Sequence, residues 1–301
     1  MADAPDRFRF TADRGDARLR LDQVLVRRLS DAVRLSRTTA RQWIDAGAVT
    51  VDGRPARRAS TTVRDGAIVE VALPDSAVRR TAPEAQEGPL AVLHEDDALL
   101  AVDKPPGLVV HPTYKQTDHT LLNALIWRLR DRPDLRPSIL TRLDKDTSGL
   151  VLVALTSAVH ATVQRDAAAG LVRKEYVAVV SGTPRPGQGR ITLALGRDPD
   201  DRRRVVTTPA GAPSETRYTV AASNGVRSRL VCELVTGRTH QIRVHLASMG
   251  WPIVGDRAYG EPSPEIPRQA LHAWRVTLPH PLTREPLTIT APVPSDIAAL
   301  L

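Results

Sequence analysis

The segment 140–155 reads LTRLDKDTSGLVLVAL, in which a polar turn is followed at once by an uninterrupted apolar run. A short apolar run bounded by turn-forming residues predicts a strand that is buried on both faces. Gly149 lets the backbone bend where the turn meets this strand. Asp144 and Asp146 are therefore expected in a turn at the start of a buried strand. They are either carboxylates held at a sheet edge for chemistry or ordinary capping residues of a turn.

A second segment, 234–260, reads LVTGRTHQIRVHLASMGWPIVGDRAYG. Its spacing predicts a helix that Thr239 caps and Gly250 ends. His240 and Arg243 are three residues apart and share a face, so the helix can present a cation into a cleft. The alternative is a half-exposed helix with solvated polar residues. The apolar stripe of this helix is formed by Ile242, Leu246 and Met249.

The residues around these segments mix strand and helix patterns. Apolar runs at 91–104, 172–182 and 229–235 predict strands, and 120–130 predicts a helix. Because strands and helices do not alternate regularly, an α+β architecture is favoured over a doubly wound sheet. The turn at 104–107 (KPPG) is interpreted as structural, and residues 197–214 are interpreted as an exposed polar loop.

Residues 18–75 predict a separate small α/β unit, preceded by a tail (1–17) and followed by a linker (76–89). Apolar spacing indicates one helix from Leu21 and a second from Ser36, its N-cap, to Ala46. Asp52-Gly53 predicts a hairpin turn between two short strands. Residues 81–301 carry 26 basic and 23 acidic residues, whereas residues 1–80 carry 16 arginines against 11 acidic residues. This concentrated charge suits a polyanion-binding module, or simply a solvated basic face.

The composition excludes several classes of protein. The sequence contains no apolar stretch of the roughly 18 residues that span a bilayer, and residues 1–20 are too charged for a secretory signal. Cys232 is the only cysteine, which excludes disulfides and cysteine-rich zinc sites. His240, His245 and His272 are not spaced as a metal-ligand set. We therefore expect a cytoplasmic protein without a metal.

Taken in order, the segments at 99–112, 140–155, 172–182 and 234–260 resemble the RluA/RluD family of pseudouridine synthases. The strings RLDKDTSGL and GRTHQIRVHLASMGWPIVGD carry the likeness, which extends over residues 90–294. The N-terminal unit is similar to the small S-four-type RNA-binding domain, named after a ribosomal protein. The resemblance implies a catalytic domain at 90–301 with a mixed, largely antiparallel central sheet flanked by helices. It also implies a small N-terminal α/β RNA-binding domain at 18–75.

The resemblance assigns roles to four residues. Asp144 matches the catalytic aspartate, and Arg142 matches an arginine that fills the space left by a flipped base. Tyr176 matches a tyrosine that packs against the target uracil. Arg243 matches the basic partner of the aspartate, although Arg238 lies in the same motif. The chain departs from the family at Thr141, where His is common, and at Leu155, where Lys is common.

Pseudouridine formation implies RNA as the partner and needs no cofactor, because no atoms are added. A flipped base must leave its stack, at a cost of a few kcal/mol. The N-terminal unit has few aromatic residues, so recognition of folded RNA by shape is favoured over base stacking. Its candidate phosphate-binding residues are Arg27, Arg28, Arg37, Arg41, Arg54, Arg57 and Arg58.

The RNA-binding domain favours large-subunit ribosomal RNA as the substrate and a monomeric enzyme. The alternatives are a tRNA enzyme of the same family and a non-catalytic ribosome-assembly factor. Covalent attack by Asp144 and proton removal that leaves a glycal both remain open.

Overall fold

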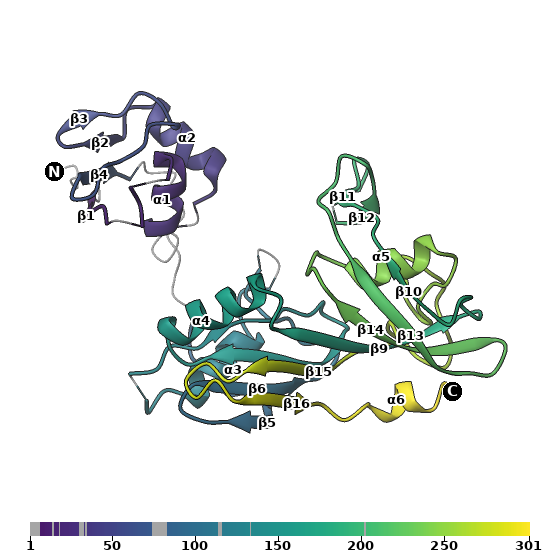
Figure 1. Ribbon diagram of the computed structural model, residues 1–301. Coiled ribbons are helices and arrows are strands. Elements are labelled where there is room, and N and C mark those ends of the chain that lie inside the picture. Colours follow the sequence, from purple (N-terminus) through teal and green to yellow (C-terminus); the bar gives the residue numbers. More distant parts are fainter. Residues whose placement is uncertain are drawn as a thin grey trace. The chain divides into compact units, whose positions relative to one another are not determined.

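The computed structural model divides into an N-terminal unit, Met1–Ala82, and a C-terminal unit, Pro83–Leu301 (Figure 1). Of the expected linker 76–89, residues 76–82 lie outside the described residues. No helix among the described residues is long and apolar enough to cross a membrane. The residues that the structure describes are 7–13, 15–17, 19–29, 33, 35–73, 83–113, 116–132, 134–201 and 203–301.

The N-terminal unit packs two helices, α1 (Leu21–Leu29) and α2 (Arg37–Asp45), with a four-stranded sheet of order β1-β4-β2-β3. Ser36 caps α2 as predicted, because its hydroxyl accepts a hydrogen bond from the Thr39 amide at 3.0 Å. The predicted hairpin turn joins β2 (Val49–Val51) to β3 (Arg54–Pro55), with positive φ angles of 51° at Asp52 and 75° at Gly53. Strand β4 (Ile68–Ala72) completes the expected α/β unit.

Strand β1 (Arg7–Thr11) lies in the segment 1–17 that the sequence analysis assigns to a tail. It pairs with β4 in antiparallel register from Arg7 opposite Ala72 to Thr11 opposite Ile68. The alternating Phe8 and Phe10 pack against the core of the unit, and this packing holds the strand in place. The folded N-terminal unit thus includes residues before position 18.

Ten described strands of the C-terminal unit form one sheet, whose main path runs β10-β13-β14-β9-β15-β8-β6-β5, and two others form a separate two-stranded sheet. Strand β16 pairs with β15, and β7 pairs with β8. Among the described residues every strand pair of this sheet is antiparallel except β15 with β8, so the expected mixed, largely antiparallel sheet is confirmed. The strands are β5 (Ala91–Glu95), β6 (Leu99–Lys104), β7 (Ser138–Ile139), β8 (Ser148–Ala154), β9 (Arg173–Ser181), β10 (Gln188–Ile191), β13 (Thr216–Ser223), β14 (Arg227–Leu234), β15 (Leu271–Pro279) and β16 (Pro286–Thr290).

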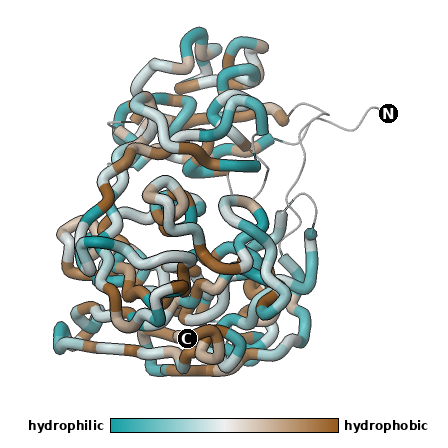
Figure 2. The backbone as a smooth tube through the Cα atoms, turned by 90° about the vertical axis from the view of Figure 1, so that its right-hand side faces the viewer, coloured by the Kyte–Doolittle hydropathy of each residue, from teal (hydrophilic) through white to brown (hydrophobic). Residues whose placement is uncertain are grey.

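Strand β8 is the buried strand predicted from residues 150–155, and all seven of its residues are buried. Helix α3 (Leu121–Arg128) packs against Val151 and Val153, whereas α4 (Ser157–Ala168) packs against Leu150 and Leu152. Helices on both faces explain why the strand is apolar throughout instead of alternating. Figure 2 shows hydrophobic and hydrophilic stretches alternating along the backbone.

Helix α5 (Gln241–Ser248) contributes Ile242 and Leu246 to the core over β9 and β14, and α6 (Ser295–Ala298) lies near the C-terminus. Met249, which was expected in the apolar stripe of α5, is 43% exposed because it follows the helix as its C-cap. The segment 197–214 also differs from expectation. Strand β12 (Val205–Thr207) pairs there with β11 (Leu195–Arg197), and Val205 packs against Val244 of α5.

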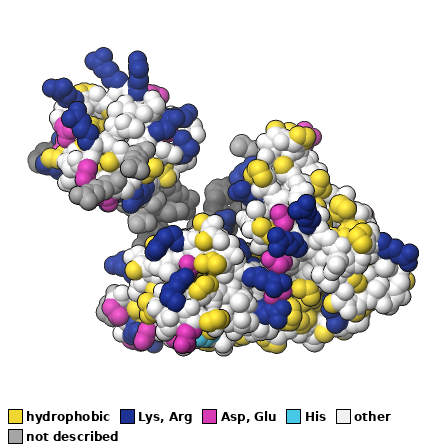
Figure 3. Space-filling model, viewed as in Figure 1, with side chains coloured by type: hydrophobic (Ala, Val, Ile, Leu, Met, Phe, Trp, Pro, Cys, Tyr) yellow, Lys and Arg dark blue, Asp and Glu magenta, His cyan; other side chains and the backbone are white. Residues whose placement is uncertain are grey.

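A row of ion pairs crosses strands β13, β14, β9 and β15. Glu233 and Glu175 stand directly opposite each other, which is unfavourable for like charges. Arg173 lies 3.2 Å from each of them, while Arg217 pairs with Glu233 and Arg275 with Glu175. Figure 3 shows such basic and acidic side chains interleaved over the middle of the C-terminal unit. Because side chains alternate along a strand, this row occupies one face of β9 and leaves Lys174 and Tyr176 to the other.

Candidate active site

Asp144 lies in the loop that leads into β8, as predicted, with its side chain 27% exposed. Gly149 has a φ of 110°, and a Cβ atom there would lie 2.2 Å from the Ala273 carbonyl oxygen. Only glycine allows β15 to approach β8 so closely at the end of this loop. The predicted bend at Gly149 thus lies where β8 and β15 pair in parallel, directly after the loop that carries Asp144.

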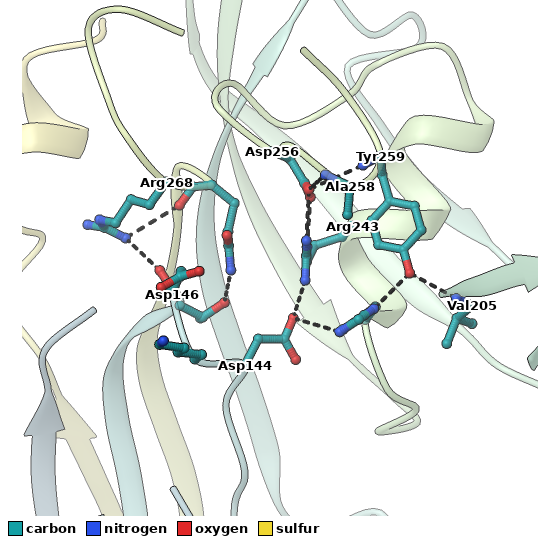
Figure 4. A network of polar contacts seen from close by, with 12 residues as sticks. Asp144, Asp146, Val205, Arg243, Asp256, Ala258, Tyr259 and Arg268 are labelled. Carbon is teal, nitrogen blue, oxygen red and sulfur yellow. Dashed lines mark hydrogen bonds and ion pairs between the residues drawn. The ribbon is translucent and has the colours of Figure 1, made fainter. Parts of the chain in front are cut away.

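Arg243 of α5 binds two carboxylates at once (Figure 4). Its Nη1 donates to Asp144 Oδ2 at 2.8 Å, and its Nε and Nη2 donate to Asp256 at 2.7 and 2.8 Å. Burial alone would lower the pKa of Arg243, but the hydrogen bonds and charges of Asp256 and Asp144 raise it above its ordinary value. The predicted contact between Asp144 and Arg243 is present. Arg238 instead donates to the Pro213 carbonyl oxygen at 3.4 Å.

His240, which the sequence places on one face with Arg243, also reaches Asp144. Its Nε2 lies 3.9 Å from Asp144 Oδ2, and its Nδ1 shares a 2.7 Å hydrogen bond with the Tyr259 hydroxyl. That hydroxyl accepts from the Val205 amide at 2.9 Å, so its own proton is available to Nδ1. Burial lowers the pKa of His240, against the opposing charge of Asp144. A neutral imidazole with its proton on Nε2 fits these contacts.

The start of α5 corrects the expected cap. Thr239 is not the N-cap; His240 is, with a left-handed φ of 53° and no capping hydrogen bond from its side chain. The Gln241 side chain instead accepts from the Arg238 amide at 3.0 Å and donates to the Glu215 carbonyl at 2.9 Å. This inward anchor replaces a cap and leaves the His240 imidazole free to turn toward Asp144.

An open pocket of about 370 Å³ lies beside Asp144. Tyr176 on β9 and Arg142, two residues before Asp144, both line it. Burial, together with the charge of Asp144, raises the pKa of Tyr176, so this phenol stays protonated. Arg142 is exposed and makes no hydrogen bond or ion pair with another residue that the structure describes. The remaining lining residues are Val109, Val110, His111, Thr113, Leu140, Thr141, Leu143, Lys174, Leu234, Gly237, Arg238 and Thr239.

The loop that carries Asp144 is held by residues that the sequence analysis left without a role. Lys104 is fully buried, and its ammonium donates to the carbonyl oxygens of Pro105, Leu108 and Lys145 at 2.8 to 3.0 Å. Burial lowers the pKa of Lys104 to about 8. The sequence contains one sign that Lys104 is buried and supports the loop, namely a lysine placed between an apolar run and two prolines. The KPPG turn is therefore structural, as interpreted, and it supports the loop.

Arg268 holds the same loop from another direction. Its Nη1 lies 3.4 Å from the Asp146 carbonyl oxygen (Figure 4). Its guanidinium also pairs with Asp296 in the first turn of α6. Gln269 donates to the Thr147 hydroxyl at 3.1 Å. These two residues lie outside the strings that carry the family resemblance, so nothing in the sequence pointed to them. Asp256 lies inside one such string and could have been singled out as a second acid for Arg243.

Thr141, the departure from the family pattern, has a local structural contact. Its hydroxyl accepts a hydrogen bond from the Leu152 amide at 2.8 Å, at the edge of β8. Leu155, the other departure, is 1% exposed and packs in the core beside α3. Neither side chain makes a hydrogen bond or ion pair with Asp144 in the part of the chain that the structure describes.

The candidate RNA-binding arginines fall into two groups, and Figure 3 shows such side chains, in dark blue, projecting from the N-terminal unit. Arg27 and Arg28 pair with Asp16, while Arg37 and Arg41 pair with Asp22; both aspartates are fully buried. The second group is exposed and makes no side-chain ion pair or hydrogen bond with other described residues: Arg54, Arg57 and Arg58. The first group is partly neutralised within the unit, whereas the second is available to a polyanion.

Comparison with known proteins identifies both units. A family model described as RNA pseudouridylate synthase matches residues 98–248, and one described as S4 domain matches residues 19–69. The chain is 39% identical, over 95% of its length and 84% of the relative's, to a "Ribosomal large subunit pseudouridine synthase D" of Nitrosomonas europaea. It is 40% identical to an "Uncharacterized RNA pseudouridine synthase" of Chloroflexus aurantiacus, over 94% of the chain and 89% of the relative. The solved structure of Human RNA Pseudouridylate Synthase Domain Containing 1 is similar, with a TM-score of 0.56 and 27% identity over 69% of this chain and 86% of that one.

Proposed function

This chain belongs to the RNA pseudouridylate synthase family, and we propose that it isomerises uridines of large-subunit ribosomal RNA with Asp144 as the catalytic carboxylate. The family makes the protein an isomerase. Curated relatives named for the large ribosomal subunit support the choice of substrate over tRNA. The observation that carries the assignment of Asp144 is its position in a pocket, bound at 2.8 Å by the doubly anchored Arg243.

In the reaction, the bond between C1′ of the ribose and N1 of uracil breaks, the base turns, and C1′ bonds to C5. The proton that leaves C5 is balanced by one gained at N1. Asp144 acts on the sugar, either by attacking C1′ or by removing the C2′ proton. Both routes need a carboxylate with a defined direction. Arg243 supplies it, because Asp256 fixes the guanidinium from its other edge.

Tyr176 and Arg142 handle the base. Tyr176 is buried in the pocket wall and stays protonated, so it offers an aromatic surface for the uracil and a neutral hydroxyl for proton transfer. Arg142 stands exposed beside the pocket and has no partner among the residues that the structure describes. It can therefore enter the helical space that the flipped uridine vacates and offset part of the unstacking cost.

The N-terminal S4 unit strengthens binding through phosphate contacts, chiefly from Arg54, Arg57 and Arg58. Arg27, Arg28, Arg37 and Arg41 add less charge to the contact because buried aspartates already pair with them. We place the enzyme in the cytoplasm, acting as a monomer on folded RNA.

Mapping pseudouridines in total RNA from cells with and without the gene tests the choice of substrate. The proposal predicts that specific pseudouridines disappear from large-subunit ribosomal RNA and return when the gene is restored. Loss confined to tRNA would contradict the substrate, and an unchanged map would contradict the activity in those cells.

A further inference from the structure

The pocket beside Asp144 has a surplus of positive charge. Its described lining contains Arg142, Lys174 and Arg238 but one acidic residue, Asp144. Asp144 is already bound to Arg243, so it does not balance the other cations. Lys174, the partly buried one of the three, is stabilised when its ammonium meets an anion, and the described residues supply none. The missing anion is therefore expected to arrive with the substrate.

Lys174 is the clearest of these cations. It lies on β9 two residues before Tyr176, so both side chains project from the same face of the strand, and both line the pocket. Its ammonium makes no hydrogen bond or ion pair with the residues described. Burial lowers the pKa of Lys174, and no neighbouring charge offsets the effect. Lys104 differs, because three carbonyl oxygens surround its ammonium.

The loop between β14 and α5 approaches Lys174 from across the pocket. A Cβ atom added at Gly237 would lie 3.8 Å from the Lys174 ammonium, so the two segments are in near contact. Arg238, the next residue, lines the same pocket. Its Nε donates to the Pro213 carbonyl oxygen at 3.4 Å, which leaves both of its terminal nitrogens without a partner among the described residues. Two cations from separate elements thus flank one part of the wall.

We propose that Lys174 and Arg238 bind the phosphodiester group adjacent to the target uridine. Uracil and ribose are neutral, so the phosphate is the part of a flipped nucleotide that can neutralise this wall. A nucleotide that leaves the helix carries its flanking phosphates toward the pocket. Two cations with different approach directions then fix the position of C1′ relative to Asp144. The inference deepens the proposed function and rests on it.

The test uses a synthetic RNA stem–loop that carries a uridine identified by the mapping described above. One phosphodiester at a time is replaced by an uncharged methylphosphonate, and affinity is measured for the wild-type protein, Lys174→Met and Lys174→Arg. For wild type, the neutral linkage beside the target uridine should weaken binding about tenfold, since it removes a charged hydrogen bond. The same replacement several linkages away serves as the matched control and should cost less.

Lys174→Met should bind unmodified RNA about tenfold more weakly, with a salt slope lower by ~0.7 to 0.9, and should lose part of its sensitivity to the adjacent methylphosphonate, because Arg238 alone then contacts that phosphate. Lys174→Arg should keep that sensitivity. The proposal is overturned if Lys174→Met still suffers the full penalty at that linkage. It is also overturned if wild type shows no penalty specific to the adjacent linkage, a result that does not depend on whether Lys174→Met folds. Wild-type conversion of the unmodified RNA separates these failures from failure of the proposed function.

Discussion

Arg243 donates hydrogen bonds to both Asp144 and Asp256, so a change at either carboxylate alters the position of the arginine that the other one binds. Arg243 is buried, with 8% of its surface exposed, so it cannot turn to water when a partner is lost. Asp256 also accepts hydrogen bonds from the Ala258 and Tyr259 amides at 3.0 and 3.2 Å. The Asp256 carboxylate thus positions both Arg243 and the turn that carries Tyr259.

Asp256→Asn tests this arrangement. The amide is nearly isosteric but uncharged, so the free energy of unfolding should fall by about 3 kcal/mol. The Arg243 guanidinium should also lose its fixed orientation. The single-turnover rate should fall roughly 10- to 100-fold, while RNA affinity changes little, because Asp256 does not line the pocket. Chemical denaturation and single-turnover assays measure both effects. A normal rate in a destabilised protein would show that Asp256 serves the fold alone.

Arg142→Ala tests the role proposed in base flipping. Because Arg142 is exposed and has no partner among the described residues, its removal should change the free energy of unfolding by less than about 0.5 kcal/mol. Modification of a structured RNA should nevertheless slow at least tenfold, since the side chain proposed to fill the space left by the base is removed. Parallel loss of thermal stability and activity would mark Arg142 as a structural residue.

Among the elements, β8, the start of α2 and the β2–β3 turn could be predicted best from the sequence, because their sequence signals are local. The apolar run 150–155 is buried on both faces, and Ser36 and Asp52-Gly53 act where a cap and a hairpin turn were expected. The start of α5 could not be predicted, because Gln241 anchors it through contacts with residues far away in the chain. Strands β1 and β12 are short and polar in part, so their existence depends on partners that the local pattern does not reveal.

The same limit applies to the site. Asp144, Arg243 and Tyr176 could be selected because they lie in segments that resemble a family, and the structure brings all three to one pocket region. Lys104 and Arg268 act by donating to backbone carbonyl oxygens of the Asp144 loop. A carbonyl acceptor leaves no mark in a sequence, so their role required the fold.

Strand β15 carries a buried histidine that should make the enzyme sensitive to acid. His272 is 1% exposed, bonds to the Ser148 hydroxyl, and has its pKa lowered by burial to about 4. Its ordinary value is near 6.5, so between these values the unfolded chain binds a proton that the folded chain does not. Stability contributed by neutral His272 is complete above about pH 6.5 and decreases by about 3 kcal/mol as the pH falls to 4.

Replacing this residue tests the assignment. His272→Gln keeps a hydrogen-bonding side chain but does not titrate, so its urea-unfolding free energy should fall less steeply between about pH 6.5 and 4. His245, whose pKa burial also lowers, remains in the variant and accounts for some residual slope. Identical pH profiles for variant and wild type would exclude His272 as a source of the acid sensitivity.

At the scale of the whole molecule, the two units are expected to separate function into anchoring and catalysis. A protein limited to residues 83–301 should fold, because the core of the C-terminal unit is complete within it. It should bind RNA more weakly and with a shallower salt dependence, since the phosphate contacts of the N-terminal unit are lost.

A matched variant of the full chain sharpens this prediction. Replacing Arg54, Arg57 and Arg58 with Gln should reduce the salt slope by about 2 to 3, because these exposed arginines are not neutralised internally. Replacing Arg37 and Arg41, which pair with Asp22, should reduce it less per residue and should destabilise the unit. Equal slopes for truncated and full-length proteins would show that the N-terminal unit is not the anchor.

Asp144→Asn in a single-turnover assay on the identified RNA tests the central claim most directly. Asp146→Asn, the same change two residues away on an exposed side chain, is the matched control. Both variants should stay folded and bind RNA like wild type, because binding is attributed to the cations. Asp146→Asn should form pseudouridine at a near-normal rate, whereas Asp144→Asn should form none detectable, since an amide is a poor nucleophile and base. A pseudouridine yield from Asp144→Asn close to that of wild type would contradict the account.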